Sequence, residues 1–197
     1  QWIDLCRGPH MRSVKDIGLR QAFANLARKD ALTELPNRIA LKEWYEQNVL
    51  MGDPGLIAVH YIDLNGFKPV NDTYGHPVGD ELLTAVGKRI AHTIRDTDIA
   101  ARLGGDEFAV IQHGLSYPNQ AEMLASRLAD AIGRPYRIGK KVIHISTGLG
   151  YVVAHGGDEE DLDHLMGLAD EALYASKRAG EVTQYEAVEA VRTRALA

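Results

Sequence analysis

The sequence contains one cysteine, Cys6, and no hydrophobic run long enough to cross a membrane. A single cysteine excludes both a disulfide framework and a zinc site built from several thiolates. A membrane span needs about 18 consecutive apolar residues, and the best candidate, Leu56–Ile62, is short and interrupted by His60. The N-terminus also lacks the basic-then-apolar pattern of a secretion signal. We therefore expect a cytoplasmic domain without membrane contact of its own.

The sequence also lacks an excess of basic residues. It has 22 Lys and Arg against 27 Asp and Glu, a formal net charge of −5. A protein that binds nucleic acid non-specifically needs a basic surface to offset the phosphates, so we expect no nucleic-acid partner. A single nucleotide remains compatible with this charge, because a bound metal ion can supply positive charge locally. With 45% hydrophobic and 25% charged residues, the composition is that of a soluble globular domain.

The chain divides into three parts. These are an N-terminal segment with a connecting helix (1–29), a main domain (30–186) and a C-terminal tail (187–197). Within residues 1–11, Gly8-Pro9-His10-Met11 resembles a protease-and-cloning remnant. Residues 12–29 carry a loose helical stripe of apolar side chains. This predicts a helix that either packs on its own domain or links it to an upstream sensor.

Helical and strand patterns alternate through the main domain. Helices are predicted over 39–51, 78–94, 119–132 and 161–179, and strands over 56–63, 99–103, 107–112, 136–138, 142–153 and 183–186. Two of the strand pairs are separated only by short glycine-containing turns, as in hairpins. Hairpins within an alternation of helices and strands predict an α+β fold, with a mostly antiparallel central sheet flanked by helices.

Acidic side chains gather at one of these hairpins. Gly104 and Gly105 favour a tight turn, because glycine adopts positive φ freely, and Asp106 and Glu107 follow at once. Asp63 ends the apolar strand 56–63. If the two strands are neighbours, Asp63 and Asp106 lie about 5 Å apart, the spacing of cross-strand partners. With a backbone carbonyl, these carboxylates would suit Mg²⁺ and a phosphate ligand. A solvated acidic turn is the alternative.

A second polar stretch runs from Asn71 to Asp80 across a turn that opens a helix. An amide and a carboxylate together can recognise guanine, because its N1–H and N2–H₂ groups donate to the carboxylate while O6 or N3 accepts from the amide. Adenine lacks this donor pair. In isolation, Asp80 could equally serve as a helix cap.

Taken together, these motifs resemble the GGDEF family of diguanylate cyclases. The resemblance rests on the stretches Asp30–Arg38, Tyr61–Lys68, Asn71–Asp80, Gly104–Phe108 and Ala172–Lys177. Glu34 stands where the family usually has glycine. The resemblance implies a sheet like the palm of nucleotidyl cyclases and polymerases. It also implies a reaction in which two GTP condense to cyclic di-GMP and two pyrophosphates. Since one domain holds one GTP, catalysis requires a homodimer.

The resemblance also implies roles for individual residues. Asp63, the Leu64 carbonyl and Asp106 match the family's metal ligands for Mg²⁺, with Mn²⁺ as an alternative, and Glu107 supports metal binding. Asp106 matches the proton acceptor for the 3′-hydroxyl. Lys68 matches a residue that stabilises charge in the transition state.

Asn71, His76, Asp80 and Lys177 match substrate-binding positions. Glu181 departs from the family, which usually has an arginine there that holds phosphates. A carboxylate at this place would weaken GTP binding.

Arg95-Asp96-Thr97-Asp98 matches the family's RxxD site, at which cyclic di-GMP inhibits the enzyme. Arg95 and Asp98 are the residues expected to bind the product, with Arg127 as an additional cation. An upstream sensor is expected in the native protein. Two other interpretations stay open: a catalytically weak relative that binds GTP or cyclic di-GMP as a sensor, and a dimerisation module.

Overall fold

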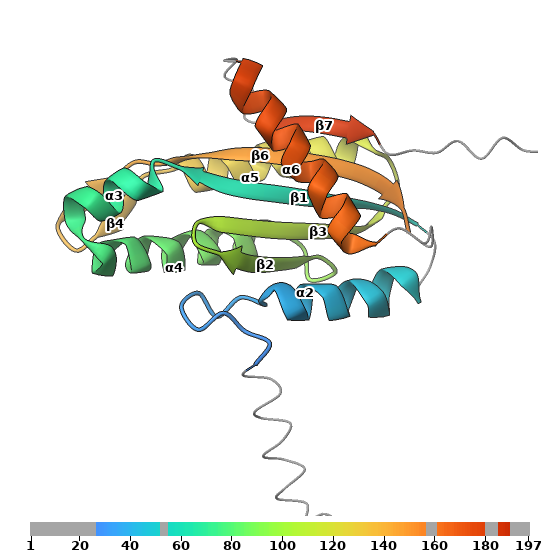
Figure 1. The fold of residues 1–197 in the computed structure, drawn as a ribbon, viewed down its shortest axis with the longest axis horizontal. Coiled ribbons are helices and arrows are strands. Elements are labelled where there is room, and N and C mark those ends of the chain that lie inside the picture. The colour runs from blue at the N-terminus through green and yellow to red at the C-terminus, as the bar shows by residue number, and fades with distance from the viewer. Residues whose placement is uncertain (1–26, 52–54, 157–160, 180–184, 190–197) are drawn as a thin grey trace, which may run out of the picture.

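The computed structural model describes residues 27–51, 55–156, 161–179 and 185–189, and its central feature is a five-stranded sheet. The strands lie in the order β2-β3-β1-β6-β7 (Figure 1). Their bounds are β1 Leu56–Asn65, β2 Ile99–Gly104, β3 Glu107–Leu115, β6 Ser146–His155 and β7 Tyr185–Glu189. All neighbours are antiparallel except β6 and β7, which are parallel. The predicted α+β fold with a mostly antiparallel sheet is confirmed.

Helices cover both faces of this sheet. One hydrophobic core packs α4 (His76–Thr93) and α5 (Asn119–Gly133) on one face. A second core packs α2 (Arg38–Tyr45), its π-helical continuation η1 (Glu46–Leu50) and α6 (Leu162–Ala179) on the other. In Figure 1, α6 crosses in front of β1 while α5 lies behind the sheet.

The side chains of β1 alternate between the two cores. Ile57 and Val59 belong to the core under α2 and α6, whereas Ala58, Ile62 and Leu64 belong to the core over α4 and α5. This alternation follows from the two-residue period of a strand. Burial on both faces explains why the sequence of β1 is an almost continuous apolar run.

The region before α4 differs from the prediction. The sequence predicts a turn between Asn71 and Asp80 and no helix between Asp63 and Val78. Instead, residues 67–74 form a separate short helix, α3 (Phe67–Tyr74), and α4 begins at His76 rather than Val78. Gly75, at φ 83°, separates the two helices, a conformation that glycine adopts without strain. Pro69 and the scarcity of apolar side chains obscure the helical pattern of α3 in the sequence.

The predicted strand 142–153 is in fact two strands. Lys141–Ile143 forms β5, which pairs with β4 (Tyr136–Ile138) in a separate two-stranded sheet, and β6 begins only at Ser146. The residues around this break are mostly of types common in strands, so the sequence does not reveal it. The predicted edge strand is found as β7, which continues to Glu189.

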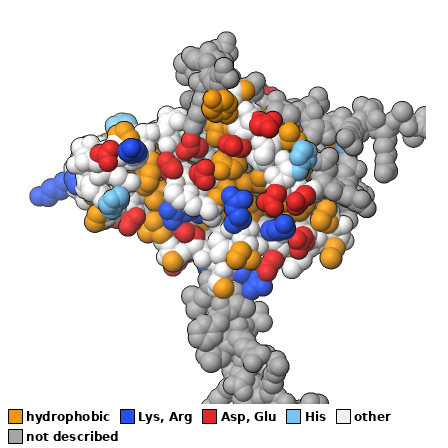
Figure 2. Space-filling model, viewed as in Figure 1, with side chains coloured by type: hydrophobic (Ala, Val, Ile, Leu, Met, Phe, Trp, Pro, Cys, Tyr) orange, Lys and Arg blue, Asp and Glu red, His pale blue; other side chains and the backbone are white. Residues whose placement is uncertain are grey.

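The predicted N-terminal helix lies mostly outside the described residues. Its last three residues, 27–29, form a turn and a bridge rather than a helix, and Lys29 pairs with Pro36. No helix in the described part of the chain is long and apolar enough to span a membrane. On the face shown in Figure 2, the described acidic and basic side chains are intermixed.

Candidate active site

The Gly104-Gly105 motif forms the turn between β2 and β3. Gly104 pairs with Glu107, so Gly105 and Asp106 are the two loop residues, and Gly105 has φ 51°. The register shifts between Arg102 and Gly104, which makes Leu103 the extra residue of a β-bulge. The predicted tight hairpin is confirmed, with Asp106 at its tip.

The β1–β3 register brings the predicted metal ligands to the same end of the sheet. The cross-strand partner of Asp63 is Glu107, not Asp106 as the sequence suggested. Asp106 lies one residue further into the turn, where its backbone carbonyl accepts a hydrogen bond of 3.3 Å from the Leu64 N–H. Four of the predicted site residues therefore converge here, although their pairing differs from the expected one.

The carboxylates of this cluster have different surroundings. Burial, together with the charge of the nearby Glu107 carboxylate, raises the pKa of Tyr61. By contrast, no hydrogen bond or ion pair of the Asp106 side chain occurs within the described residues. Asp63, Asp106 and Glu107 are all partly exposed. A ligand can therefore reach them.

The oxygen atoms at this end of the sheet are a suitable donor set for Mg²⁺. No group of three His, Cys, Asp or Glu side chains with metal-site geometry occurs among the described residues, so a metal here would need backbone or substrate oxygens as well. The N–H and C=O of one strand residue project from the same edge. Since the Leu64 N–H bonds to Asp106, the Leu64 carbonyl also faces the hairpin. Oxygen-only ligands, completed by phosphate, are the ones Mg²⁺ prefers.

Arg102 braces the turn and was not predicted as a site residue. Its Nε and Nη2 donate to the Gly105 carbonyl at 3.1 and 2.7 Å, and its Nη1 donates to both oxygens of Asp30 at 3.0 and 3.1 Å. Burial opposes the charge on Asp30, but hydrogen bonds from Thr33 and Arg102 hold its pKa below the usual value. The two residues are 72 positions apart, so no local pattern reveals this pair.

Helices α3 and α4 bring the predicted guanine-binding residues together. A Cβ on Gly79 would lie 1.9 Å from Asn71 Oδ1, so only glycine lets α4 approach this amide so closely. Asp80 is the next residue. Asn71 Oδ1 is buried and has no hydrogen-bond partner in the described part of the structure.

Three other predicted residues of this region, Lys68, His76 and Asp80, are exposed. Lys177 lies on α6, but its side chain is outside the described residues, and so is Glu181. The structure therefore does not place the phosphate contacts expected from these two positions.

Arg95 and Asp98 lie at the other end of β2 from the Gly105-Asp106 turn. Asp98 is buried, and its carboxylate accepts hydrogen bonds from the backbone N–H groups of Arg95 at 3.0 Å and His113 at 3.2 Å. Arg95 is exposed. Arg127 of α5 donates to the Thr93 carbonyl at 2.5 Å. Since Thr93 lies two residues before Arg95 in the chain, this bond brings Arg127 near the loop.

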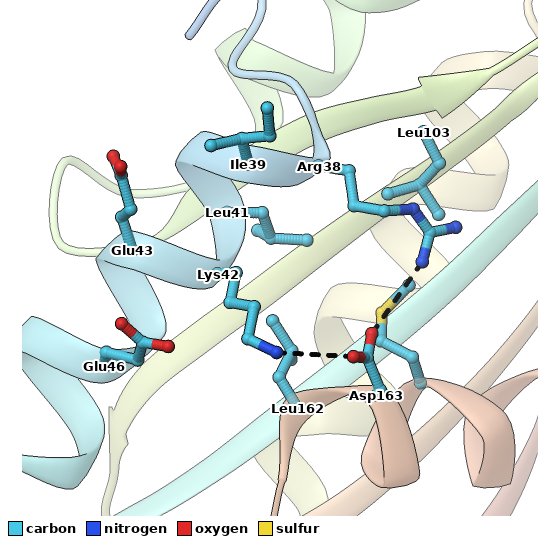
Figure 3. A pocket seen from close by; sticks show the side chains of 10 residues that line it. Arg38, Ile39, Leu41, Lys42, Glu43, Glu46, Leu103, Leu162 and Asp163 are labelled. Carbon is cyan, nitrogen blue, oxygen red and sulfur yellow. Dashed lines mark hydrogen bonds and ion pairs between the residues drawn. The ribbon is translucent and has the colours of Figure 1, made fainter.

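A pocket of about 290 Å³ lies between α2 and α6 and contains none of the predicted site residues (Figure 3). Leu41, Leu103 and Leu162 are among its apolar lining residues. Arg38 and Lys42 reach across to Asp163, with Lys42 at 3.4 Å. The hairpin contributes only Leu103, so this pocket is separate from the carboxylate cluster.

Comparison with known proteins identifies the family. The profile described as "Diguanylate cyclase, GGDEF domain" matches residues 27–183. The chain is 41% identical over 157 residues to a bifunctional diguanylate cyclase/cyclic di-GMP phosphodiesterase, MucR of Pseudomonas aeruginosa, covering 79% of this chain and 23% of MucR. It is 36% identical over 157 residues to the Escherichia coli phosphodiesterase PdeR, covering 79% of this chain and 23% of PdeR. The chain belongs to the GGDEF domain family.

Solved structures agree with this assignment. The coiled coil and GGDEF domain of DgcB from Caulobacter crescentus, solved with cyclic di-GMP, superposes with a TM-score of 0.70 at 28% identity, covering 88% of this chain and 94% of that one. The diguanylate cyclase SiaD of Pseudomonas aeruginosa, in complex with its activator SiaC, gives a TM-score of 0.74 at 26% identity, covering 89% and 66%. The chain spans about a quarter or less of the curated relatives it matches.

Proposed function

We propose that this domain is an active diguanylate cyclase, which condenses two GTP into cyclic di-GMP and two pyrophosphates. The observation that carries the proposal is the convergence of Asp63, the Leu64 carbonyl, Asp106 and Glu107 at one end of the sheet. Such a cluster of oxygens is suited to Mg²⁺-dependent phosphoryl chemistry. A bound Mg²⁺ would polarise the α-phosphate and offset the charge on the leaving pyrophosphate.

The protein supplies further groups for the triphosphate next to this cluster. Helix α3 begins just after β1, and its N-cap residue, Gly66, provides no side-chain hydrogen bond to the first turn. In this turn Pro69 has no N–H and the Val70 N–H bonds to the Gly66 carbonyl. The N–H groups of Phe67 and Lys68 are therefore the ones available to phosphate oxygens. Lys68, in the same turn, is exposed and adds positive charge. Asp106 would accept the proton of the attacking 3′-hydroxyl.

Asn71 and Asp80 would recognise the guanine base, with His76 contributing from the start of α4. The close packing of Gly79 against the Asn71 side chain supports this assignment, because Asp80 directly follows Gly79 and so lies near the same amide. Lys177 would contact the phosphates. Since each domain binds one GTP, two copies must face each other for each 3′-hydroxyl to attack the other nucleotide.

Product control is proposed at Arg95 and Asp98. The exposed Arg95 guanidinium can form a fork of charge-assisted hydrogen bonds to phosphate or guanine, and Asp98 shapes the loop that presents it. Arg127 would add a second cation. Arg95→Ala should weaken cyclic di-GMP binding by roughly 1.5–3 kcal/mol while initial rates stay similar. Calorimetric titration of both proteins tests this, and equal affinities would contradict it.

A second candidate is a catalytically weak domain that binds GTP or cyclic di-GMP within a larger protein. The observation in its favour is that PdeR and NbdA, both named phosphodiesterases, contain a matching domain. In either case, the relatives' greater length supports further domains, including an upstream sensor, in the native protein.

Incubation of the protein with GTP and Mg²⁺, followed by identification of the products, separates the two candidates. We expect cyclic di-GMP and pyrophosphate from the unaltered protein. ATP should compete poorly with GTP, because adenine leaves the guanine-binding groups unpaired. Asp80→Ala should lower the affinity for GTP and reduce that preference. Binding of GTP without any product would favour the sensor, and equal competition by ATP would refute the guanine assignment.

A further inference from the structure

The peptide group that joins Asp63 to Leu64 is held from both sides. Its N–H, on Leu64, donates to the Asp106 carbonyl at 3.3 Å on the β3 side. Its C=O, on Asp63, accepts a hydrogen bond of 2.9 Å from the Thr147 hydroxyl on the β6 side. Thr147 is the cross-strand neighbour of Leu64 and is only 4% exposed.

This peptide group lies between the two β1 groups that the proposed function assigns to the metal. The Asp63 carboxylate is on one side of it along the chain, and the Leu64 carbonyl is on the other. If the peptide plane rotates, both groups move together. A partner that fixes the plane therefore fixes two ligands at once, which is the role that groups around a metal site commonly play.

We propose that Thr147 is a positioning residue, whose hydroxyl fixes the Asp63–Leu64 peptide and thereby aligns the Asp63 carboxylate and the Leu64 carbonyl for a divalent cation. The inference rests on the proposed function, since it uses the same cation site. Thr147 lies in β6, a strand that is not part of any motif recognised in the sequence.

The hydroxyl has a second acceptor within reach. The Gly148 carbonyl lies 3.0 Å from Thr147 Oγ1, almost as close as the Asp63 carbonyl. A hydroxyl has one proton to donate, so the two carbonyls compete for it. The inference requires that the Asp63 carbonyl receives a substantial part of this bond, and removal of the Thr147 hydroxyl tests whether it does.

Three variants of the full chain test the proposal. Thr147→Val removes the hydroxyl at nearly constant shape, and Thr147→Ser keeps it. Thr93→Val is the matched control, because the Thr93 hydroxyl also donates to a backbone carbonyl, that of Arg89, but lies at the far end of α4. Two quantities are measured: Mn²⁺ affinity in the presence of a non-hydrolysable GTP analogue, by electron paramagnetic resonance, and hydrogen exchange of the Leu64 amide, by NMR without metal.

We expect Thr147→Val to weaken Mn²⁺ binding about tenfold, the lower end of the range for groups that orient metal ligands, and to speed exchange at Leu64. Thr147→Ser should restore both, and Thr93→Val should change neither. Wild-type Mn²⁺ affinity and Leu64 exchange in Thr147→Val would overturn the proposal. If Thr147→Val does not fold, Thr147→Ala replaces it, and its Mn²⁺ affinity and Leu64 exchange are compared with those of Thr147→Ser. A wild-type protein that binds Mn²⁺ but forms no cyclic di-GMP would refute the proposed reaction alone, since the Mn²⁺ and exchange comparison still decides the role of Thr147.

Discussion

Two aspartates mark the two ends of the β2–β3 hairpin, and the protein uses them differently. Asp98, just before β2, is buried and accepts hydrogen bonds from two backbone N–H groups. Asp106, in the turn after β2, is partly exposed, and its carboxylate has no partner among the described residues. The two ends are on the order of 20 Å apart, at about 3.3 Å per strand residue.

The difference separates a structural carboxylate from one that is available to a ligand. A charge can be buried when donors surround it, and Asp98 meets this condition with one N–H from its own loop and one from β3. Asp106 has no such donors in the described part of the structure, and Glu107 beside it adds like charge. Its charge is therefore best offset by a cation from outside the chain. Substitution of Asp106 should therefore lower activity, whereas substitution of Asp98 should lower stability.

The largest effect is expected for Asp106→Asn. An amide cannot replace the charge of a Mg²⁺ ligand, so turnover of GTP should fall at least about 100-fold, or roughly 3 kcal/mol in the activation barrier. Stability should change by no more than about 0.5 kcal/mol, because no internal contact is lost. Product formation and denaturant unfolding provide the measurements. Asp63→Asn should have the same effect on turnover.

A suitable control is Asp130→Asn, which alters an exposed aspartate of α5 and should leave both quantities unchanged. Near wild-type turnover in Asp106→Asn would contradict the assignment of this carboxylate to the metal.

The reverse outcome is expected at Asp98. Asp98→Ala leaves the N–H groups of Arg95 and His113 without their acceptor, and we expect a loss of about 3 kcal/mol in the free energy of unfolding. Initial turnover of the folded protein should be little affected. Asp96→Ala, which removes an exposed carboxylate from the same loop, is the control for denaturant unfolding. Equal stability of the two variants would show that Asp98 is not structural.

His60 extends the comparison to a buried group that cannot keep its charge. It is fully buried in the middle of β1, and burial lowers its pKa to about 4, with a smaller opposing influence from Gln112. The unfolded chain binds this proton near pH 6.5. Below that pH the unfolded state holds more protons than the folded state, so stability falls as the pH decreases towards 4.

Between pH 7 and pH 5 this single group should cost about 2 kcal/mol of stability. Unfolding of the wild type and of His60→Leu at both pH values isolates the contribution, because the other histidines affect both proteins alike. Parallel losses in the two proteins would show that His60 is not the source.

The features that the sequence predicted were those set by local pattern. The apolar run of β1, the two glycines of the hairpin and the stripe of α5 each determine a local structure from neighbouring residues. The sequence could not reveal that Asp63 pairs with Glu107, since a shift of one residue in register changes the partner. It could not reveal the contacts of Asp30 with Arg102 or of Asp63 with Thr147 either, because these residues are 72 and 84 positions apart.

The smallest effect is expected at Glu34, the position at which the family usually has glycine. Glu34 has φ 61°, a left-handed conformation that costs most residues about 1 kcal/mol or more. Gly105, at the turn braced by Arg102, has nearly the same φ without this cost. The N–H of Glu34 bonds to the carbonyl of Asp30, whose side chain holds the other end of Arg102. The strain at Glu34 is therefore maintained by contacts that also brace the hairpin.

Glu34→Gly should relieve this strain. Because glycine is also more flexible in the unfolded chain, we expect a net gain of only about 0.5–1 kcal/mol in the free energy of unfolding. Glu34→Ala removes the same exposed carboxylate but keeps the Cβ, so it should give no such gain. Denaturant unfolding of the three proteins measures the difference. If alanine stabilises as much as glycine, the carboxylate rather than the backbone is the source of the cost, and the preference of the family for glycine here needs another explanation than φ.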